Sequence, residues 1–212
     1  MSIPTDLRTR KRLATRQAIS NIATRLFLER GFDQVKVDEI AAAADVGRMT
    51  VFNHFPRKED MFFDRDEEGR EALRSALRQR NPDISPIEAL RLLAHSLVAH
   101  DSAYMRFSSE SQGFIATIEG SETLKARARA IRDEIAQLLA SELALSAGRD
   151  GGEQDAQLAA GLVVATWTVA LLQAHQTFRQ SHEVKQAQAV FLSMIDKGSI
   201  GVQAAMAGTP YA

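Results

Sequence analysis

The chain has 212 residues, of which 45% are hydrophobic and 25% are charged, and its 26 Lys and Arg residues nearly balance its 27 Asp and Glu residues. This composition is typical of a soluble globular protein that is long enough to bury a sizeable core. The absence of cysteine excludes a disulfide framework, a cysteine-ligated metal centre and a cysteine nucleophile, and it favours a reducing cytoplasm. No apolar segment follows the basic N-terminus, so we expect no secretory signal.

The near-neutral total charge conceals an uneven distribution. Residues 1–60 hold 11 basic and 8 acidic residues, a net charge of +3, whereas the remaining residues hold 15 basic and 19 acidic residues, a net charge of -4. A basic head on an acidic body is typical of a two-part protein whose head binds an anion. A solvated N-terminal arm would explain the basic charge equally well.

Three helices are expected at the start of the chain. Apolar residues recur at helical spacing from Thr9 to Arg30, and Gly31 ends this first helix. We expect a second helix from Asp38 to Ala44, with acidic residues in its first turn, and a third from Met49 to Phe55. Two short helices joined by a turn that contains a glycine form a helix-turn-helix, whose second helix can enter the major groove of DNA.

The rest of the chain is also expected to be helical, which gives an all-α fold class of about nine helices. The expected elements are, in chain order, a long charged helix from Lys58 to about Arg80, a helix at 86–101 that a capping box at Ser85–Glu88 begins, a less regular segment at 103–119, a helix at 121–145, a glycine-rich loop at 146–154, and two final helices at 155–180 and 183–207.

Residues 38–60, with the sequence DEIAAAADVGRMTVFNHFPRKED, strongly resemble the helix-turn-helix of tetracycline-repressor-like (TetR/AcrR) transcriptional regulators. The resemblance covers about residues 12–63, because the family pattern of the first helix is also matched, by Ala23, Phe27, Gly31 and Phe32. It implies a DNA-binding domain with a basic N-terminal arm at 1–57 and an effector-binding and dimerisation domain at 58–212. The implied function is that of a cytoplasmic, ligand-responsive transcriptional regulator: a homodimeric repressor that a small, mostly apolar molecule releases from a palindromic operator in double-stranded DNA.

The resemblance also assigns DNA-binding residues, namely Arg48, Met49, Thr50, Phe52, Asn53, His54 and Lys58. Arg48 and Met49 would face the bases, where an arginine reads guanine with its two-pronged guanidinium and a methionine offers only an apolar contact. Thr50, His54 and Lys58 occupy positions that in the family bind phosphates, which anchors the helix without reading sequence.

Three positions depart from the family pattern. Gly47 stands in place of the usual serine or threonine before the third helix, Val37 in place of a threonine before the second, and Phe52 in place of a tyrosine that donates to a phosphate. DNA affinity would then depend more on Arg48, on Lys58 and on the basic arm, which consists of Arg8, Arg10, Lys11, Arg12 and Arg16. A helical adaptor that has lost DNA binding is an alternative function.

In the second domain the resemblance implies a dimer interface on the last two helices and a ligand pocket among the others. The helix at 155–180 has two apolar faces, and which of them meets a partner is open; a central helix of a monomeric bundle is the alternative. The interface candidates are Leu158, Leu162, Ala165, Val169, Leu172, Phe191, Met194 and Ile195. The pocket candidates, each of which could instead be a core residue, are His100, Tyr104, Phe107, Phe114, Trp167, Leu171 and His175.

Other classes of function find little support in the sequence. The histidine spacings do not suit a metal site, and we expect neither a metal nor another cofactor. The sequence has no phosphate-binding glycine loop, nucleophile elbow or HExxH motif, so we expect no enzyme. The most apolar stretch, 158–172, is too short to span a membrane, and we expect no membrane partner.

Overall fold

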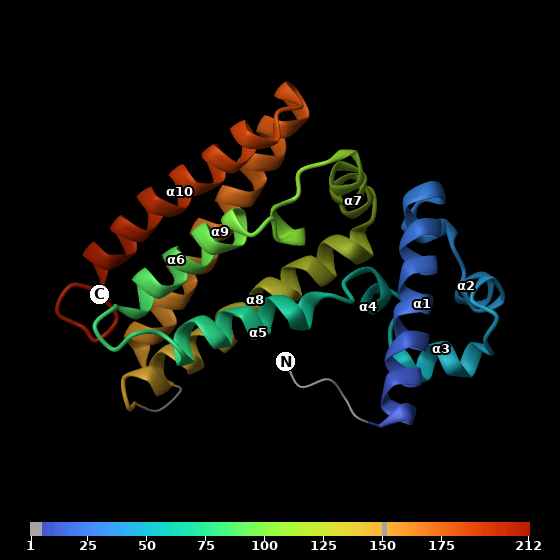
Figure 1. The fold of residues 1–212 in the computed structure, drawn as a ribbon, viewed down its shortest axis with the longest axis horizontal. Coiled ribbons are helices and arrows are strands. Elements are labelled where there is room, and N and C mark those ends of the chain that lie inside the picture. The colour runs from blue at the N-terminus through green and yellow to red at the C-terminus, as the bar shows by residue number, and fades with distance from the viewer. Residues whose placement is uncertain (1–5, 150–151) are drawn as a thin grey trace. The chain divides into compact units, whose positions relative to one another are not determined.

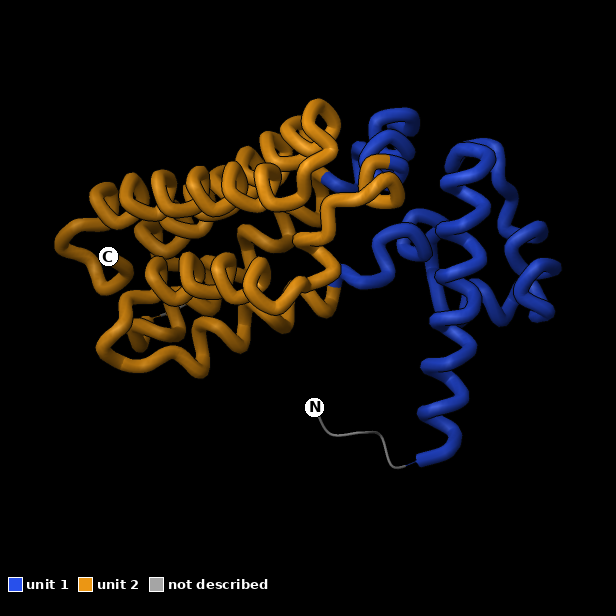
Figure 2. Tube along the Cα trace, turned by 45° about the horizontal axis from the view of Figure 1, so that its top comes forward, with its two compact units in different colours: residues 1–66, 113–128 blue, residues 67–112, 129–212 orange. Residues whose placement is uncertain are grey.

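The computed structural model describes residues 6–149 and 152–212. Within these residues the chain forms ten α-helices, two short 3-10 helices and no strand, which confirms the all-α prediction (Figure 1). The chain divides into two compact units (Figure 2). We call residues 1–66 and 113–128 the N-terminal unit, and residues 67–112 and 129–212 the C-terminal unit.

The N-terminal unit contains α1 (Leu7–Arg30), a 3-10 turn (Phe32–Gln34), α2 (Val37–Ala43), α3 (Arg48–His54) and α4 (Glu59–Phe62). Helix α1 begins at Asp6, whose carboxylate accepts a hydrogen bond from the Arg8 N–H at 3.2 Å. It ends at Gly31, whose φ of 84° favours glycine. The core of this unit is apolar, and its fully buried side chains include Ile19, Phe27, Ile40, Val51 and Phe55.

The long helix expected from Lys58 to about Arg80 is wrong, because the structure divides it into α4 and α5 (Asp66–Arg78). Phe62 stacks on Phe114 with ring centroids 4.2 Å apart, and Phe63 meets the same ring edge-on at 6.1 Å. Consecutive residues point to different sides of a helix, so both rings reach Phe114 only where the helix is interrupted. This break also accounts for ten helices where about nine were expected.

The C-terminal unit contains α5, α6 (Pro86–Ala99), a 3-10 turn (Ala103–Met105), α9 (Gln154–Ser181) and α10 (Val184–Ala205), while α7 (Ser109–Glu119) and α8 (Glu122–Ser146) contribute residues to both units. Ser85 caps α6 as predicted, since its hydroxyl accepts from the Glu88 N–H at 3.2 Å. Helices α9 and α10 run side by side (Figure 1). They approach closely at Gly198, where a Cβ atom would lie 2.2 Å from Cγ2 of Thr166.

Helix α9 is long and apolar enough to cross a membrane by length and composition alone, with a mean hydropathy of 1.5 in its most apolar window. One third of that window is buried inside the protein. Its remaining apolar side chains lie mainly on one exposed face, which includes Leu158, Val169 and Leu172. The helix is therefore a two-sided packing element, with one side covered by its own chain.

Candidate nucleic-acid interface

Helices α2 and α3 are held together by a tight turn over buried small and branched side chains. Asp45 adopts a φ of 52°, and the Val46 N–H donates to the Ala41 carbonyl at 3.0 Å. Ala41 is buried between the helices, and Val51 of α3 has no exposed surface. Because the inner face of α3 is fixed in this way, its outer residues Arg48, Met49 and Asn53 are presented to solvent. Met49 is 69% exposed, which is unusual for so apolar a side chain.

The first residue of α3, Arg48, is held by an acidic residue of α2. Its Nη1 atom lies 3.1 Å and 3.0 Å from the two carboxylate oxygens of Asp38. The guanidinium also lies 5.5 Å from the ring centre of Phe52. Both charged side chains are more than half exposed, so the pair is weak and can open when a stronger partner arrives. The sequence analysis did not single out Asp38, whose only signal is its position in the first turn of α2.

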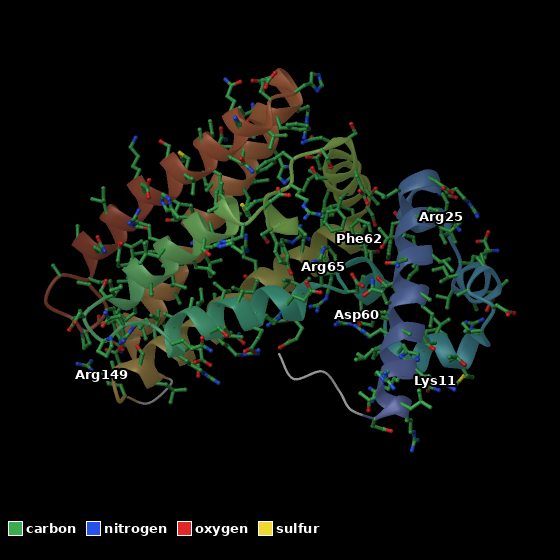
Figure 3. All side chains as sticks on the ribbon, in the orientation of Figure 1. Lys11, Arg25, Asp60, Phe62, Arg65 and Arg149 are labelled. Carbon is green, nitrogen blue, oxygen red and sulfur yellow. The ribbon has the colours of Figure 1, made fainter. Side chains whose placement is uncertain are left out.

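The other end of α3 is packed against the basic start of α1. Arg16 donates to the backbone carbonyl of His54, and its guanidinium lies 4.0 Å from the ring centre of Phe55. Burial, reinforced by the positive charges of Arg12 and Arg16, lowers the pKa of His54, which is therefore neutral at pH 7. From Leu7 onward the basic arm is helical, and Lys11 lies on these same turns (Figure 3). The arm thus continues the surface that α3 begins.

Lys58 is half-buried and bound within its own unit. Its ammonium group donates to the Phe32 carbonyl at 2.5 Å and lies 4.2 Å from the ring centre of Phe32 and 5.6 Å from that of Phe27. Burial lowers its pKa. These contacts tie the segment after α3 to the end of α1, so Lys58 supports the domain internally even if it also meets a phosphate.

The positions that depart from the family pattern have clear local consequences. Gly47 is the N-cap of α3 and offers no side chain to bind the free N–H groups there. A Cβ at Gly47 would have only Thr50 Oγ1 within 4 Å, at 3.9 Å, so a serine would fit. Helix α2 is capped without the usual threonine, because the Glu39 carboxylate accepts from the Lys36 N–H at 2.8 Å. Val37 is partly buried and packs against the core instead.

The structure brings only some of the pocket candidates together. Phe107 packs edge-on against His175 at 5.0 Å, and both Trp167 and Leu171 join the same apolar cluster of the C-terminal unit. Burial, followed by the charge of Arg179, lowers the pKa of His175, which stays neutral at pH 7. Two further candidates, His100 and Tyr104, are exposed, whereas Phe114 lies in the core of the N-terminal unit.

The interface candidates also separate into two groups. Leu158, Val169 and Leu172 are 52%, 44% and 55% exposed on one face of α9, and Leu162 and Ala165 share this face. In contrast, Phe191 and Ile195 of α10 are fully buried within the protomer, and Met194 is partly buried beside them. The candidates on α9 are thus exposed, whereas those on α10 are buried or partly buried in the core of the C-terminal unit. In the described parts of the chain, no group of three His, Asp or Glu side chains could hold a metal ion.

Known proteins are similar in sequence to the region of the chain that contains α2 and α3. Residues 19–64 match the family described as bacterial regulatory proteins, tetR family. This part of the chain is therefore similar to the DNA-binding region of that family. The HTH-type transcriptional regulator TcmR of Streptomyces glaucescens is 34% identical to it over 84 residues, which are 40% of this chain and 37% of TcmR. MftR of Mycobacterium tuberculosis is 43% identical over 49 residues, or 23% of this chain and 25% of MftR.

Solved structures show a likeness in fold over most of the chain. The SmeT–triclosan complex has a TM-score of 0.56 at 18% identity, covering 91% of each chain. NalD, the secondary repressor of the MexAB-OprM multidrug efflux pump in Pseudomonas aeruginosa, has a TM-score of 0.57 at 18% identity, covering 89% of this chain and 96% of NalD. The chain thus matches well under half the length of these curated relatives in sequence, while the likeness in fold covers about nine tenths of it.

Proposed function

We propose that this protein is a DNA-binding transcriptional regulator that places α3 in the major groove of an operator. The observation that carries the proposal is the outer surface of α3, where Arg48, Met49 and Asn53 are exposed above a rigid, buried inner face. An arginine fork can read guanine, and an exposed methionine can contact the methyl group of thymine. The match of residues 19–64 to the tetR family of regulatory proteins supports the same activity and argues against an enzyme.

Phosphate contacts would flank the base-reading residues. Thr50, Asn53 and His54 follow Arg48 along α3, and the basic residues of α1 lie next to its end. Phe52 can contribute only packing, and Lys58 acts at least partly through its contacts with Phe32. The phosphate grip would therefore come chiefly from neutral donors on α3 and from the arginines at the start of α1.

We propose that the protein acts as a homodimer through the exposed face of α9, formed by Leu158, Leu162, Ala165, Val169 and Leu172. A contiguous apolar face on a long helix is costly to leave in water, and a second copy of the same face would cover it. The two copies of α3 would then bind half-sites about one helical turn, or ~34 Å, apart on a palindromic operator. Phe191, Met194 and Ile195 would hold the interface helices in place from the core.

The remaining parts of the proposal concern the effector and the division of the chain. We propose that residues 1–57 bind DNA, that residues 58–212 dimerise and bind a small, mostly apolar molecule, and that the protein works in the cytoplasm as a repressor which this molecule releases. The cluster of Phe107, Trp167, Leu171 and His175 supports an apolar site with one polar group. His100, Tyr104 and Phe114 lie outside this cluster.

A fluorescence-anisotropy titration with the DNA upstream of the protein's own gene tests the proposal. The wild-type protein should bind specifically and lose affinity as salt rises. Arg48→Ala should abolish specific binding without loss of helical content. The matched control is Arg132→Ala, because Arg132 is also exposed and pairs with a neighbouring carboxylate, that of Asp133, at 3.3 Å. Equal specific binding by both variants would refute the role of Arg48, and a wild-type protein without specific binding would favour the adaptor alternative.

A further inference from the structure

The C-terminal unit has a surface groove whose lining includes none of the pocket residues expected from the sequence. It runs between α5 and α6 and has a volume of about 280 Å³. Its walls are apolar and come from Ala76, Ile84, Ala89, Leu92 and Leu93, with Ser96 at one side. Leu92 is 40% exposed along it. The groove is close to the lower end of the roughly 300–1,000 Å³ range of small-molecule sites.

One charged side chain, Arg80, lines this apolar groove. Its Nε atom is buried, and no described residue accepts a hydrogen bond from it. The two preceding arginines of this region are paired, since Arg74 lies 2.7 Å from Glu67 and Arg78 lies 2.5 Å from Glu142. A buried donor that lacks an acceptor destabilises the free protein, because it has lost water without gaining a partner. Arg80 therefore places a buried N–H group, without an acceptor among the described residues, at the edge of an apolar surface.

We propose that this groove binds a small organic acid, with its carboxylate on Arg80 and its apolar body along Leu92 and Leu93. A carboxylate suits the site because two oxygens match the parallel N–H groups of one guanidinium. A phosphate would need several more donors than the groove offers: among the described residues that line it, the only other polar side chain is Ser96, whose hydroxyl lies 3.3 Å from Nδ1 of His100. The volume admits an apolar body of about ten heavy atoms, the size of a phenylpropyl or cyclohexyl group.

Isothermal titration calorimetry of the full-length protein without DNA tests this inference. The probes are 3-phenylpropionate, cyclohexylacetate and the neutral amide 3-phenylpropionamide. For ligands of this size a Kd on the order of 0.1–1 mM is expected. At least one acid should bind with one site per chain, and 3-phenylpropionate should bind about 10-fold more tightly than its amide. Arg80→Gln should remove this preference, whereas Arg132→Gln, the exposed-arginine control, should keep it.

A second variant, Ala76→Leu, fills the groove from α5 and leaves Arg80 in place. It should weaken binding of the acid and the amide alike, and circular dichroism would show that both variants keep their helices. Failure of both acids to bind, equal affinity for 3-phenylpropionate and its amide, or unchanged binding by Arg80→Gln would each overturn the inference. Because no DNA is present, these results do not depend on the proposed regulatory function.

Discussion

The pairing of Arg48 with Asp38 predicts that the protein restrains its own main base-reading residue. In Asp38→Asn the two contacts of 3.1 Å and 3.0 Å lose their charge, and Arg48 becomes free to meet DNA. An exposed ion pair contributes about 0.2–1 kcal/mol, so each head should gain on the order of 0.5–1 kcal/mol of DNA affinity. For two heads this amounts to about 5–30-fold tighter operator binding.

Non-specific DNA should gain more than the operator does. On the operator, a bidentate contact with guanine, which discriminates by about 1–3 kcal/mol, already draws Arg48 away from Asp38. On other sequences only phosphates compete with Asp38, so removing its charge has a larger effect there. The ratio of specific to non-specific affinity should therefore fall in Asp38→Asn, although both affinities rise.

Fluorescence anisotropy with the operator and a scrambled duplex, at two salt concentrations, measures this ratio. The matched control is Asp45→Asn, which removes one negative charge from the same helix-turn-helix without freeing Arg48. The reasoning is refuted if the two variants behave alike, or if Asp38→Asn binds the operator no more tightly than the wild type while its thermal unfolding is unchanged.

Three further predictions follow from particular contacts. Gly198→Ala should destabilise the protein by about 1–3 kcal/mol in chemical denaturation, because a Cβ would clash with Thr166 at 2.2 Å, and Gly201→Ala, which meets nothing within 4 Å, should not. Burial and the carboxylate of Glu153 raise the pKa of Tyr211 to about 12 from 10. The stability that the protonated Tyr211 side chain contributes is therefore full below pH 10 and is lost between pH 10 and pH 12. A Tyr211→Phe variant should lack that loss in alkaline unfolding curves. His54 is neutral at pH 7, and DNA phosphates favour its charged form, so operator affinity should rise from pH 7 to pH 6 in the wild type and stay flat in His54→Gln.

Local signals in the sequence predicted several helix ends and one close helix contact well. Gly31 ends α1, Ser85 caps α6, and the small residue Ala41 allows α2 and α3 to approach, and each of these depends on neighbours within a few residues. The break after α4 was missed because helical periodicity counts apolar residues without knowing which ring they will meet. Only the folded chain shows that Phe114 lies beside Phe62.

The same limit applies to the candidate sites. The family pattern identified the exposed residues of α3, but it gave no indication that Asp38 holds Arg48 or that Lys58 is bound to the Phe32 carbonyl. In the sequence, an apolar stripe on α10 that faces a partner cannot be told from one that faces its own core. The structure buries Phe191 and Ile195 inside the protein's own core. Arg80 carried no signal either, since the sequence does not show that its Nε atom is buried without an acceptor among the described residues.

Selection of bound DNA from a random pool tests the central claim, that α3 reads sequence as part of a dimer, most directly. The wild-type protein should enrich an inverted repeat whose half-sites are one helical turn apart. Arg48→Ala, with its fold intact, should lose the preference for a guanine in each half-site. Enrichment of no palindrome by the wild type, or enrichment of the same palindrome by both proteins, would contradict the account.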